Sequence, residues 1–586
     1  MIMPTFSTGN RRIANISATV ARARPNLYDV IVFLAVGALF VAVAHGTKSM
    51  HQSIEGLEIH PVSLQPRNLP QYALLTTLRM FAALGFSLLF TFLVAPLAAK
   101  SKKAERLIIP ALDILQSVPV LGFLTFTVVF FMNLFPGSEW GAELAAIFAI
   151  FTSQAWNMTF SFYQSLKTTP RDLEEAARQF RLTPWQRFWK LEAPFATPGL
   201  VWNMMMSMSG GWFFVVASEA ISVGDTRITL PGIGSYISLA IDQQNLGAVA
   251  WAVLAMAVVI MLYDQLLFRP VVAWSDKFRV ELVAAQAQPK SWVLDLVRRA
   301  QLVSVISGIM SGILQFFSGN FITLSKQIPE PPKVSSRAST LFDWAWNIAL
   351  LALAAWAAWS VFSYVRGTLG WSDFGEAVED GFITFFRVAV LIVIASLIWV
   401  PIGVYIGLRP ALAERVQPVA QFLAAFPANV LFPFVVVGIA TYHLNPNIWL
   451  SPLIVLGTQW YILFNVIAGA SVFPSDLAEA STLYRVKHWQ WWRKVILPGI
   501  FPYYVTGALT ASGGSWNASI VAEVASWGNT RLEAKGLGAY IANATAAGDF
   551  HRVVLGVGIM SVFVVVVNRL LWRRLYSLAD RRLRLD

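Results

Sequence analysis

The chain has 586 residues, of which 56% are hydrophobic and only 13% charged, and its mean hydropathy is +0.59. This composition excludes an ordinary soluble protein and indicates an integral membrane protein. The formal net charge of +12 does not indicate nucleic-acid binding, because the basic residues are spread between apolar runs instead of clustering. The absence of cysteine excludes disulfides and thiolate metal sites, and the six His residues lack metal-ligand spacing.

Twelve apolar runs of about 20 residues, the length that crosses the core of a bilayer, follow one another along the chain. We therefore predict an all-α membrane protein with about 12 transmembrane helices. The first six spans are predicted near 28–46, 72–98, 111–133, 141–165, 200–218 and 246–268. The second six are predicted near 341–365, 379–408, 418–441, 447–470, 502–524 and 551–572.

The distribution of basic residues predicts the orientation of these spans. With a cytoplasmic N-terminus, the inside segments hold 35 of the 44 Lys and Arg residues and the outside loops hold 7. The positive-inside rule therefore places both termini in the cytoplasm. The predicted organisation is an N-terminal tail (1–27), a first six-span domain (28–275), a linker (276–340), a second six-span domain (341–580) and a basic tail (581–586).

The linker contains one segment, 302–324, that is apolar enough to count as a thirteenth span. A single extra crossing would invert the second set of spans and move its basic loops outside. We therefore predict an amphipathic helix in the membrane interface, with a re-entrant segment as the alternative. The Pro-rich stretch 328–333 reads as a stiff spacer.

The two sets of spans are copies of each other. At an offset of 304 residues, segments 172–201 and 476–505 are identical at 11 of 30 positions without a gap. The same offset pairs Trp212 with Trp516, and further upstream an offset of 308 pairs Arg79 with Arg387. An even number of crossings separates the copies, so they are predicted to be parallel, with one pathway between them.

The best-matched segment is the polar loop between the fourth and fifth spans of each half, predicted to be cytoplasmic. The loop residues that carry the match are Glu175, Ala176, Ala177 and Pro194 in the first copy, and Glu479, Ala480, Ser481 and Pro498 in the second. Both loops resemble the E-A-A-x-x-x-G signature of binding-protein-dependent ABC importer permeases, with Arg181 and Arg485 where that signature has Gly. The similarity is closest to the nitrate, sulfonate, taurine and bicarbonate branch.

This resemblance implies two tandem type I permease domains in the bacterial cytoplasmic membrane, importing a small solute such as an anion. It implies that the two loops dock on two separate ATPase subunits, which hold ATP and Mg. A periplasmic or lipid-anchored solute-binding protein would deliver substrate near 220–245 and 525–550. The residues agree with a partner ATPase, because the dipeptide Gly-Lys of a P-loop occurs nowhere in the chain, and no catalytic motif is found. The alternative interpretation of each loop is a solvated amphipathic helix–turn–helix.

Polar and small residues within the spans are candidates for the translocation pathway, each with a structural alternative. Gln154 with Trp156, and Gln459 with Trp460, would line the pathway or form interhelical hydrogen bonds. The remaining candidates are two arginines, two glutamates and two tryptophans next to Gly-rich segments: Arg79, Arg387, Glu219, Glu523, Trp212 and Trp516. The arginines would contact an anion, extend their charge to the membrane surface or pair with the glutamates. The Gly-rich segments would bend a helix, admit substrate or allow close helix packing.

A second class of protein shares duplicated helices, namely ion-coupled secondary transporters. Such a transporter needs ionisable residues near the middle of the membrane, and apart from the two arginines this sequence has almost none. A receptor or scaffold would leave the duplicated loop unexplained.

Overall fold

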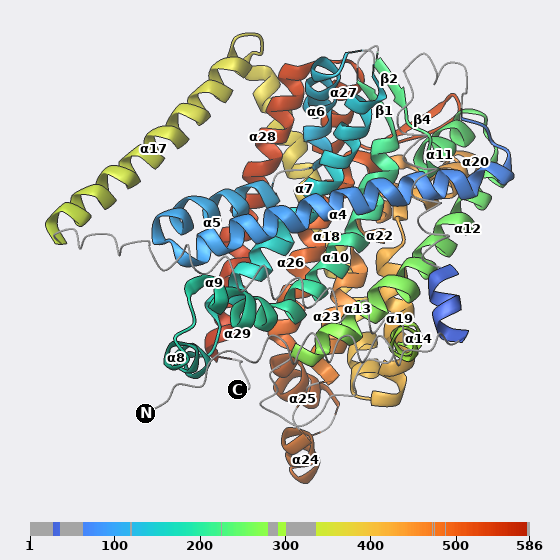
Figure 1. Ribbon diagram of the computed structural model, residues 1–586. Helices are drawn as coiled ribbons and strands as arrows, with labels where there is room; N and C mark the ends of the chain where they lie inside the picture. Colours follow the sequence, from blue (N-terminus) through green and yellow to red (C-terminus); the bar gives the residue numbers. More distant parts are fainter. Residues whose placement is uncertain are drawn as a thin grey trace, which may run out of the picture.

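The computed structural model describes residues 27–34, 62–278, 291–300 and 336–582, apart from 118, 119, 137, 224, 225, 472, 474 and 487. Long helices dominate the described chain, and two short hairpins cap one end (Figure 1). The elements of the first half are α4 (Leu69–Lys100), α5 (Lys102–Ser117), α6 (Val120–Leu134), α7 (Glu139–Lys167), α8 (Arg171–Gln179), α9 (Pro184–Arg187), α10 (Ala193–Glu219), β1 (Ala220–Val223), β2 (Thr226–Thr229), α11 (Ile233–Asp242), α12 (Leu246–Tyr263), α13 (Arg269–Ser275) and α14 (Trp292–Arg299).

The second half follows the same order. Its elements are α17 (Ser336–Arg366), α18 (Trp371–Gly407), α19 (Pro410–Ala425), α20 (Phe432–Thr441), α21 (Pro446–Trp449), α22 (Ser451–Leu456), α23 (Gln459–Ser471), α24 (Ser475–Leu483), α25 (His488–Trp491), α26 (Leu497–Ala522), β3 (Val524–Trp527), β4 (Thr530–Glu533), α27 (Leu537–Ala546), α28 (Phe550–Val567) and α29 (Arg573–Arg582).

The described residues contain seven helices that are long and apolar enough to cross a membrane, or nine if each of two bent helix pairs is one span. The all-α membrane class is thereby confirmed. The predicted span 141–165 is the straight helix α7, and the predicted span 111–133 is divided between α5 and α6. Most of the predicted span 28–46, and the whole of 302–324 and 328–333, lie outside the described residues.

Two further spans that were predicted as single helices each consist of two helices that meet at a bend. In the segment predicted as 418–441, α19 and the helical segment Ala428–Thr441 meet at a bend of more than 40° beside Pro427. Proline has no N–H and disfavours helical geometry in the residue before it, which explains this break. In the segment predicted as 447–470, the axis turns by 43° between α22 and α23, at Gly457. Glycine lowers helix propensity there.

The duplication extends to the bounds of individual elements. Helix α8 recurs as α24, and the hairpins, α11 and α12 recur as β3, β4, α27 and α28, each 304 residues later. Single π-helical turns recur at the same offset, at Phe188–Glu192 and Trp492–Ile496, and again at Asp264–Phe268 and Asn568–Trp572. A π-turn adds one residue to a helix, so both copies retain the same local shift of register.

The two hairpins were not predicted, because 220–245 and 525–550 were interpreted as loops. Strands β1 and β2, and likewise β3 and β4, pair antiparallel in short ladders of four residues. The second hairpin turns at Gly528-Asn529, where Gly528 has φ +55°. This backbone conformation suits glycine, and a two-residue turn of this type matches the twist of paired strands.

The two halves contact each other through the helices of the third predicted span in each half. Helix α6 of the first half packs against α26 and α28 of the second, while α19 and α20 pack against α10 and α12. The closeness is visible at Gly122, where an added Cβ would collide with the side chain of Val557. The hydrophobic core of the first half accordingly includes Ala425 and Val430 from the second. The third predicted span of each half therefore packs against helices of the other half.

Candidate functional site

The two predicted coupling loops lie at one end of the molecule, opposite the hairpins (Figure 1). Helices α8 and α24 carry their motifs. Glu175 and Glu479 are exposed, whereas Ala177 and Ser481 are buried. Pro194 and Pro498 follow the π-turns closely, at the first turns of α10 and α26. In each motif, the acidic residue is therefore free to contact a partner while the small residue packs inward.

Arg181 and Arg485 occupy the position where the family signature has glycine, and their backbones keep a conformation typical of glycine. Their φ angles are +53° and +50°, in the left-handed region. The N–H of Arg181 donates to the carbonyl of Arg178 at 2.9 Å, and that of Leu182 donates to Ala177 at 3.1 Å. This pattern is a Schellman motif, which ends α8 abruptly. The departure in sequence leaves the local fold intact.

Both loops present large apolar side chains to the surface. Phe180 and its counterpart Tyr484 are 80% and 79% exposed, and Trp185 and its counterpart Trp489 are 45% and 70% exposed. Exposed aromatic residues at matching positions of two polar loops are typical of protein interaction surfaces. We call Phe180, Trp185, Tyr484 and Trp489 the loop aromatics.

Ion pairs fix the first coupling loop to the membrane helices. Glu192, buried at the π-turn before α10, pairs with Lys100 at 3.0 Å and with Arg187 at 2.7 Å. Lys100 also lies 5.0 Å from the ring centroid of Phe188. The counterpart of Glu192 is Ile496, which is buried in the hydrophobic core. The first loop is thus held by charge and the second by apolar packing.

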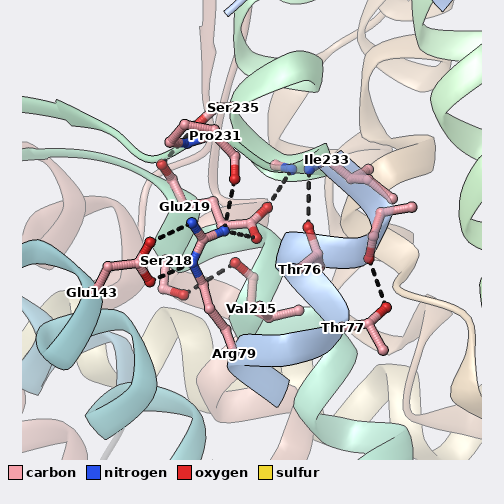
Figure 2. A network of polar contacts seen from close by, with 12 residues as sticks. Thr76, Thr77, Arg79, Glu143, Val215, Ser218, Glu219, Pro231, Ile233 and Ser235 are labelled. Carbon is pink, nitrogen blue, oxygen red and sulfur yellow. Dashed lines mark hydrogen bonds and ion pairs between the residues drawn. The ribbon is translucent and has the colours of Figure 1, made fainter. Parts of the chain in front are cut away.

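At the opposite end, Arg79 of α4 forms the centre of a buried polar cluster (Figure 2). Its Nε and Nη2 donate to the carboxylate of Glu143 at 2.7 and 2.6 Å. Its Nη1 donates to Glu219 at 2.7 Å and to the carbonyl of Pro231 at 2.9 Å. The Arg79 side chain is fully buried. Because protein groups accept from all three guanidinium nitrogens, these contacts favour the structural pair over the anion contact.

The same cluster holds the loop between β2 and α11. The N–H of Gly234 donates to Glu219 at 2.7 Å, and that of Ile233 donates to the hydroxyl of Thr76 at 3.0 Å. An added Cβ at Gly232 would overlap the Glu219 carboxylate, so the Gly-x-Gly is needed for this close approach. Arg79, Glu219 and the glycines together fasten the start of α11 to α4 and α10.

The second half repeats the cluster in reduced form. Arg387 pairs with Glu523 and donates to the carbonyl of Lys535 at 2.9 Å, and its side chain is 10% exposed. Thr384 accepts from the N–H of Leu537 at 2.9 Å, as Thr76 does from Ile233. The counterpart of Glu143 is Asn447, whose Oδ1 accepts instead from the N–H of Lys535 at 2.8 Å.

The remaining pathway candidates lie in packing contacts. Gln154 is fully buried and accepts from Ser87 at 3.4 Å, within the first half. Gln459 accepts from the indole N–H of Trp399 at 2.8 Å. The four tryptophans pack against other rings: Trp156 against Phe90, Trp460 against Trp399, Trp212 against Tyr263 and Trp516 against Phe563. Helix packing accounts for these contacts, and a role in the pathway stays a prediction.

Sequence reasoning missed the side chains that join the two halves. The N–H of Val120, directly after the break before α6, donates to Oδ1 of Asn517 at 2.8 Å. Near the equivalent break, Nδ2 of Asn429 donates to the carbonyl of Phe213 at 3.2 Å. Phe213 and Asn517 are 304 residues apart, so the two contacts form a nearly symmetric pair. The available signal was Asn429, two residues after the Pro427 beside which its predicted span bends.

Sequence reasoning also missed Glu143, the second carboxylate of the Arg79 cluster. It lies one turn inside the predicted span 141–165, as an acidic residue in an otherwise apolar run. A charge at this position in a span predicts a buried partner. The same signal marks Asp380, discussed below, in the second predicted span of the second half.

A duplicated helical membrane protein with twin surface loops at one end and an interlocked centre has the architecture of a transport permease. The model of the family "Binding-protein-dependent transport system inner membrane component" matches residues 87–269 and 399–585, together more than half of the chain. The chain belongs to this family and contains two copies of its domain.

Individual relatives cover smaller parts of the chain. It is 25% identical over 184 residues to the nitrate import permease protein NrtB of Leptolyngbya laminosa, which is 31% of this chain and 62% of the relative. It is 32% identical over 139 residues to the bicarbonate transport system permease protein CmpB of Synechococcus elongatus, 24% of this chain and 48% of the relative. The glycine betaine permease OpuAB of Bacillus subtilis is 27% identical over 169 residues, 29% of this chain and 55% of the relative. The matches thus span about half to two thirds of these proteins.

Proposed function

We propose that this permease forms the translocation pathway of an ATP-driven importer and that its two coupling loops each dock on a separate ATPase subunit. The observation that carries the proposal is the recurrence of α8 and α24 at one end, with the exposed Glu175 and Glu479 and the loop aromatics. An isolated chain would leave these rings in water, whereas a docked subunit would cover them. ATP and Mg would be held by the partner ATPases.

The family assignment and the paired carboxylates both argue against an ion-coupled transporter. Three of the buried carboxylates in the described chain, Glu143, Glu219 and Glu523, are tied to arginines, as expected of structural groups and unlike a proton relay. We propose instead that closure of the ATPases draws the two loops together and moves the interlocked helices between them. The symmetric contacts of Val120 with Asn517 and of Asn429 with Phe213 would then rearrange.

Docking is tested by co-purification of the ATPase with the full chain. We expect the double substitution Glu175→Ala and Glu479→Ala to release the ATPase, and Phe180→Ser with Tyr484→Ser to do the same. Glu379→Gln, an exposed acidic residue that pairs with Lys535 just after the second hairpin, is the matched control and should leave the complex intact. Retention of the ATPase with full transport in both double variants would refute the coupling assignment.

We propose that the coupling loops face the cytoplasm and the hairpins face the periplasm, with both termini cytoplasmic. The chain has no cysteine, so single Cys residues can be introduced without a background. In cells that lack the ATPase subunits, Phe180→Cys should react with a membrane-impermeant maleimide only after the cells are permeabilised, and Ser526→Cys, exposed on β3, should react in intact cells. The reverse pattern would invert the orientation.

We propose a small anion, such as nitrate, a sulfonate or bicarbonate, as the substrate, delivered by a solute-binding protein to the hairpin end. The relatives named for nitrate and bicarbonate support this proposal, and the relative named for glycine betaine defines the competing substrate class. Stimulation of ATPase activity in the reconstituted complex, with the cognate binding protein and a panel of anions plus glycine betaine, tests it. Stimulation by glycine betaine alone would overturn the anion.

A further inference from the structure

A site outside the coupling machinery lies at the hairpin end of the second half, and the first half shows what normally fills it. In the first half, Tyr236 of α11 donates its hydroxyl to the carbonyl of Leu64 at 3.0 Å. Tyr72 of α4 accepts from the N–H of Ser63 at 3.0 Å, and the rings of Tyr72 and Tyr236 lie 6.2 Å apart. The segment before α4 thus covers both tyrosines.

In the second half the equivalent groups are Asp380 and Tyr540. The chain enters α18 directly from α17, through the short connection 367–370. Asp380 is only 6% exposed, yet its Oδ1 has no hydrogen-bond partner among the described residues, and the same holds for the buried hydroxyl of Tyr540. Oδ1 of Asp380 lies 4.0 Å from Nζ of Lys535, at the outer limit of an ion pair. The polar groups at these two positions therefore have hydrogen-bond partners in the first half, whereas their buried counterparts in the second half have none among the described residues.

Both groups line a half-open cavity of about 600 Å³. The charged residues in its lining are four acidic and two basic side chains: Glu376, Asp380, Glu533, Asp549, Lys535 and Arg552. The counterparts of these six residues in the first half, at offsets of 308 or 304, are all uncharged: Asn68, Tyr72, Thr229, Asn245, Pro231 and Ala248. The charge is thus specific to the second half.

The two basic residues of the lining already have acidic partners. Lys535 pairs with Glu379 at 2.6 Å, a contact that raises its pKa, and Arg552 pairs with Asp373 at 3.2 Å and Asp549 at 3.6 Å. The cavity therefore retains an excess of negative charge with unfilled acceptors. The described residues hold no group of three or more carboxylates or imidazoles placed to bind a metal ion. A ligand with several N–H donors on a positive charge fits better than a bare cation.

We propose that this cavity binds a small organic amine, with its ammonium group donating to Asp380 and its alkyl chain or a second ammonium reaching toward Glu376. The Tyr540 hydroxyl, buried without a partner among the described residues, would turn toward the same ammonium group and accept from it. The site is present once per chain, because the first half fills the equivalent space with Tyr72 and the segment before it.

Calorimetric titration of the purified full-length chain in detergent, with putrescine as the probe, tests the proposal at constant ionic strength. We expect putrescine to bind with one site per chain, and 1,4-butanediol, which has the same length without charge, not to bind. Asp380→Asn should weaken binding by about tenfold or more, because it removes the charge that the ammonium pairs with. Tyr540→Phe, which removes only a hydroxyl, should weaken it by a few-fold.

Control variants separate the site from general electrostatics and from misfolding. Glu376→Gln changes an exposed residue of the lining and should weaken putrescine binding without affecting folding. Glu174→Gln, at the coupling end, should leave binding unchanged. Equal affinity in Asp380→Asn, Glu376→Gln and the unmodified chain, binding of the diol, or full displacement of putrescine by equimolar Mg²⁺ would each overturn the proposal. None of these readouts depends on transport or ATPase activity.

Discussion

The clusters around Arg79 and Arg387 arose from one duplicated unit and now differ in one acidic residue. Arg79 is fully buried between two carboxylates, while Arg387 is 10% exposed and pairs with one. The arginine contacts that both copies keep are those to the glutamate at the C-terminal end of α10 or α26 and to the carbonyl just before the Gly-x-Gly. One ion pair is therefore enough to hold this loop in place, and the second carboxylate occurs where the arginine side chain is fully buried.

We expect the largest difference between the halves in the free energy of unfolding when Arg79 and Arg387 are replaced one at a time. Arg79→Met leaves Glu143 and Glu219 buried without a counter-charge, so we expect the free energy of unfolding to fall by about 3–5 kcal/mol. Arg387→Met should cost less, because water reaches this site and only Glu523 loses its partner. Thermal unfolding of the two variants in detergent measures this. Equal losses would show that the second carboxylate has no energetic role.

A steric change tests the part that both clusters share. Gly232→Ala and Gly536→Ala would each push a Cβ against the carboxylate of Glu219 or Glu523, so we expect both to destabilise the chain by about 1–3 kcal/mol. The control is Gly438→Ala in α20, where nothing lies within 4 Å of the added atom. Unfolding midpoints of the three variants provide the measurement. If the control fell as far as the others, crowding at the carboxylate would not be the cause.

The divergent position itself is expected to show a smaller asymmetry. Glu143→Gln replaces a carboxylate that accepts two bonds from Arg79, and we expect a loss of about 1–2 kcal/mol. Asn447→Ala removes a single neutral hydrogen bond to the N–H of Lys535, for a loss of about 0.5–1 kcal/mol. Unfolding of the double variant should show additive losses, since the two sites share no contacts in the described chain.

An effect of the opposite sign, and of similar size in both halves, is expected at the coupling loops. Arg181→Gly and Arg485→Gly relieve a left-handed backbone, so we expect each to stabilise the chain by about 1 kcal/mol. Arg181→Ala keeps a Cβ and should give no gain. Unfolding midpoints measure the stabilisation, and co-purified ATPase shows whether the arginine side chain has a separate docking role.

Much of this arrangement could be predicted from residues alone. The match at an offset of 304 predicted two parallel copies, and the pairing of Arg79 with Glu219 was one of three interpretations of charges within apolar runs. These predictions succeeded because burying an arginine in a membrane segment requires a partner, and few acidic residues were available. The position of the surface helices followed from polar loops that retained their residues through the duplication.

Other features escaped prediction for physical reasons. The hairpins are too short for a period-two pattern to distinguish them from loops. Gly457 is the one local signal for the break between α22 and α23, and glycine alone does not determine such a bend, so tertiary packing decides it. The cavity beside Asp380 is invisible in sequence, because it exists through the absence of a covering segment that only the first half supplies.

The joining of both copies in one polypeptide has a consequence for evolution and stoichiometry. A transporter assembled from two identical permease chains would carry every feature twice, so an acidic cavity beside one pseudo-symmetric tyrosine would appear beside the other. Here the described part of each molecule carries one coupling loop held by ion pairs, one held by apolar packing and one acidic cavity beside Asp380. Covalent fusion thus allows the two domains to diverge, because each domain is always paired with the other and never with a second copy of itself.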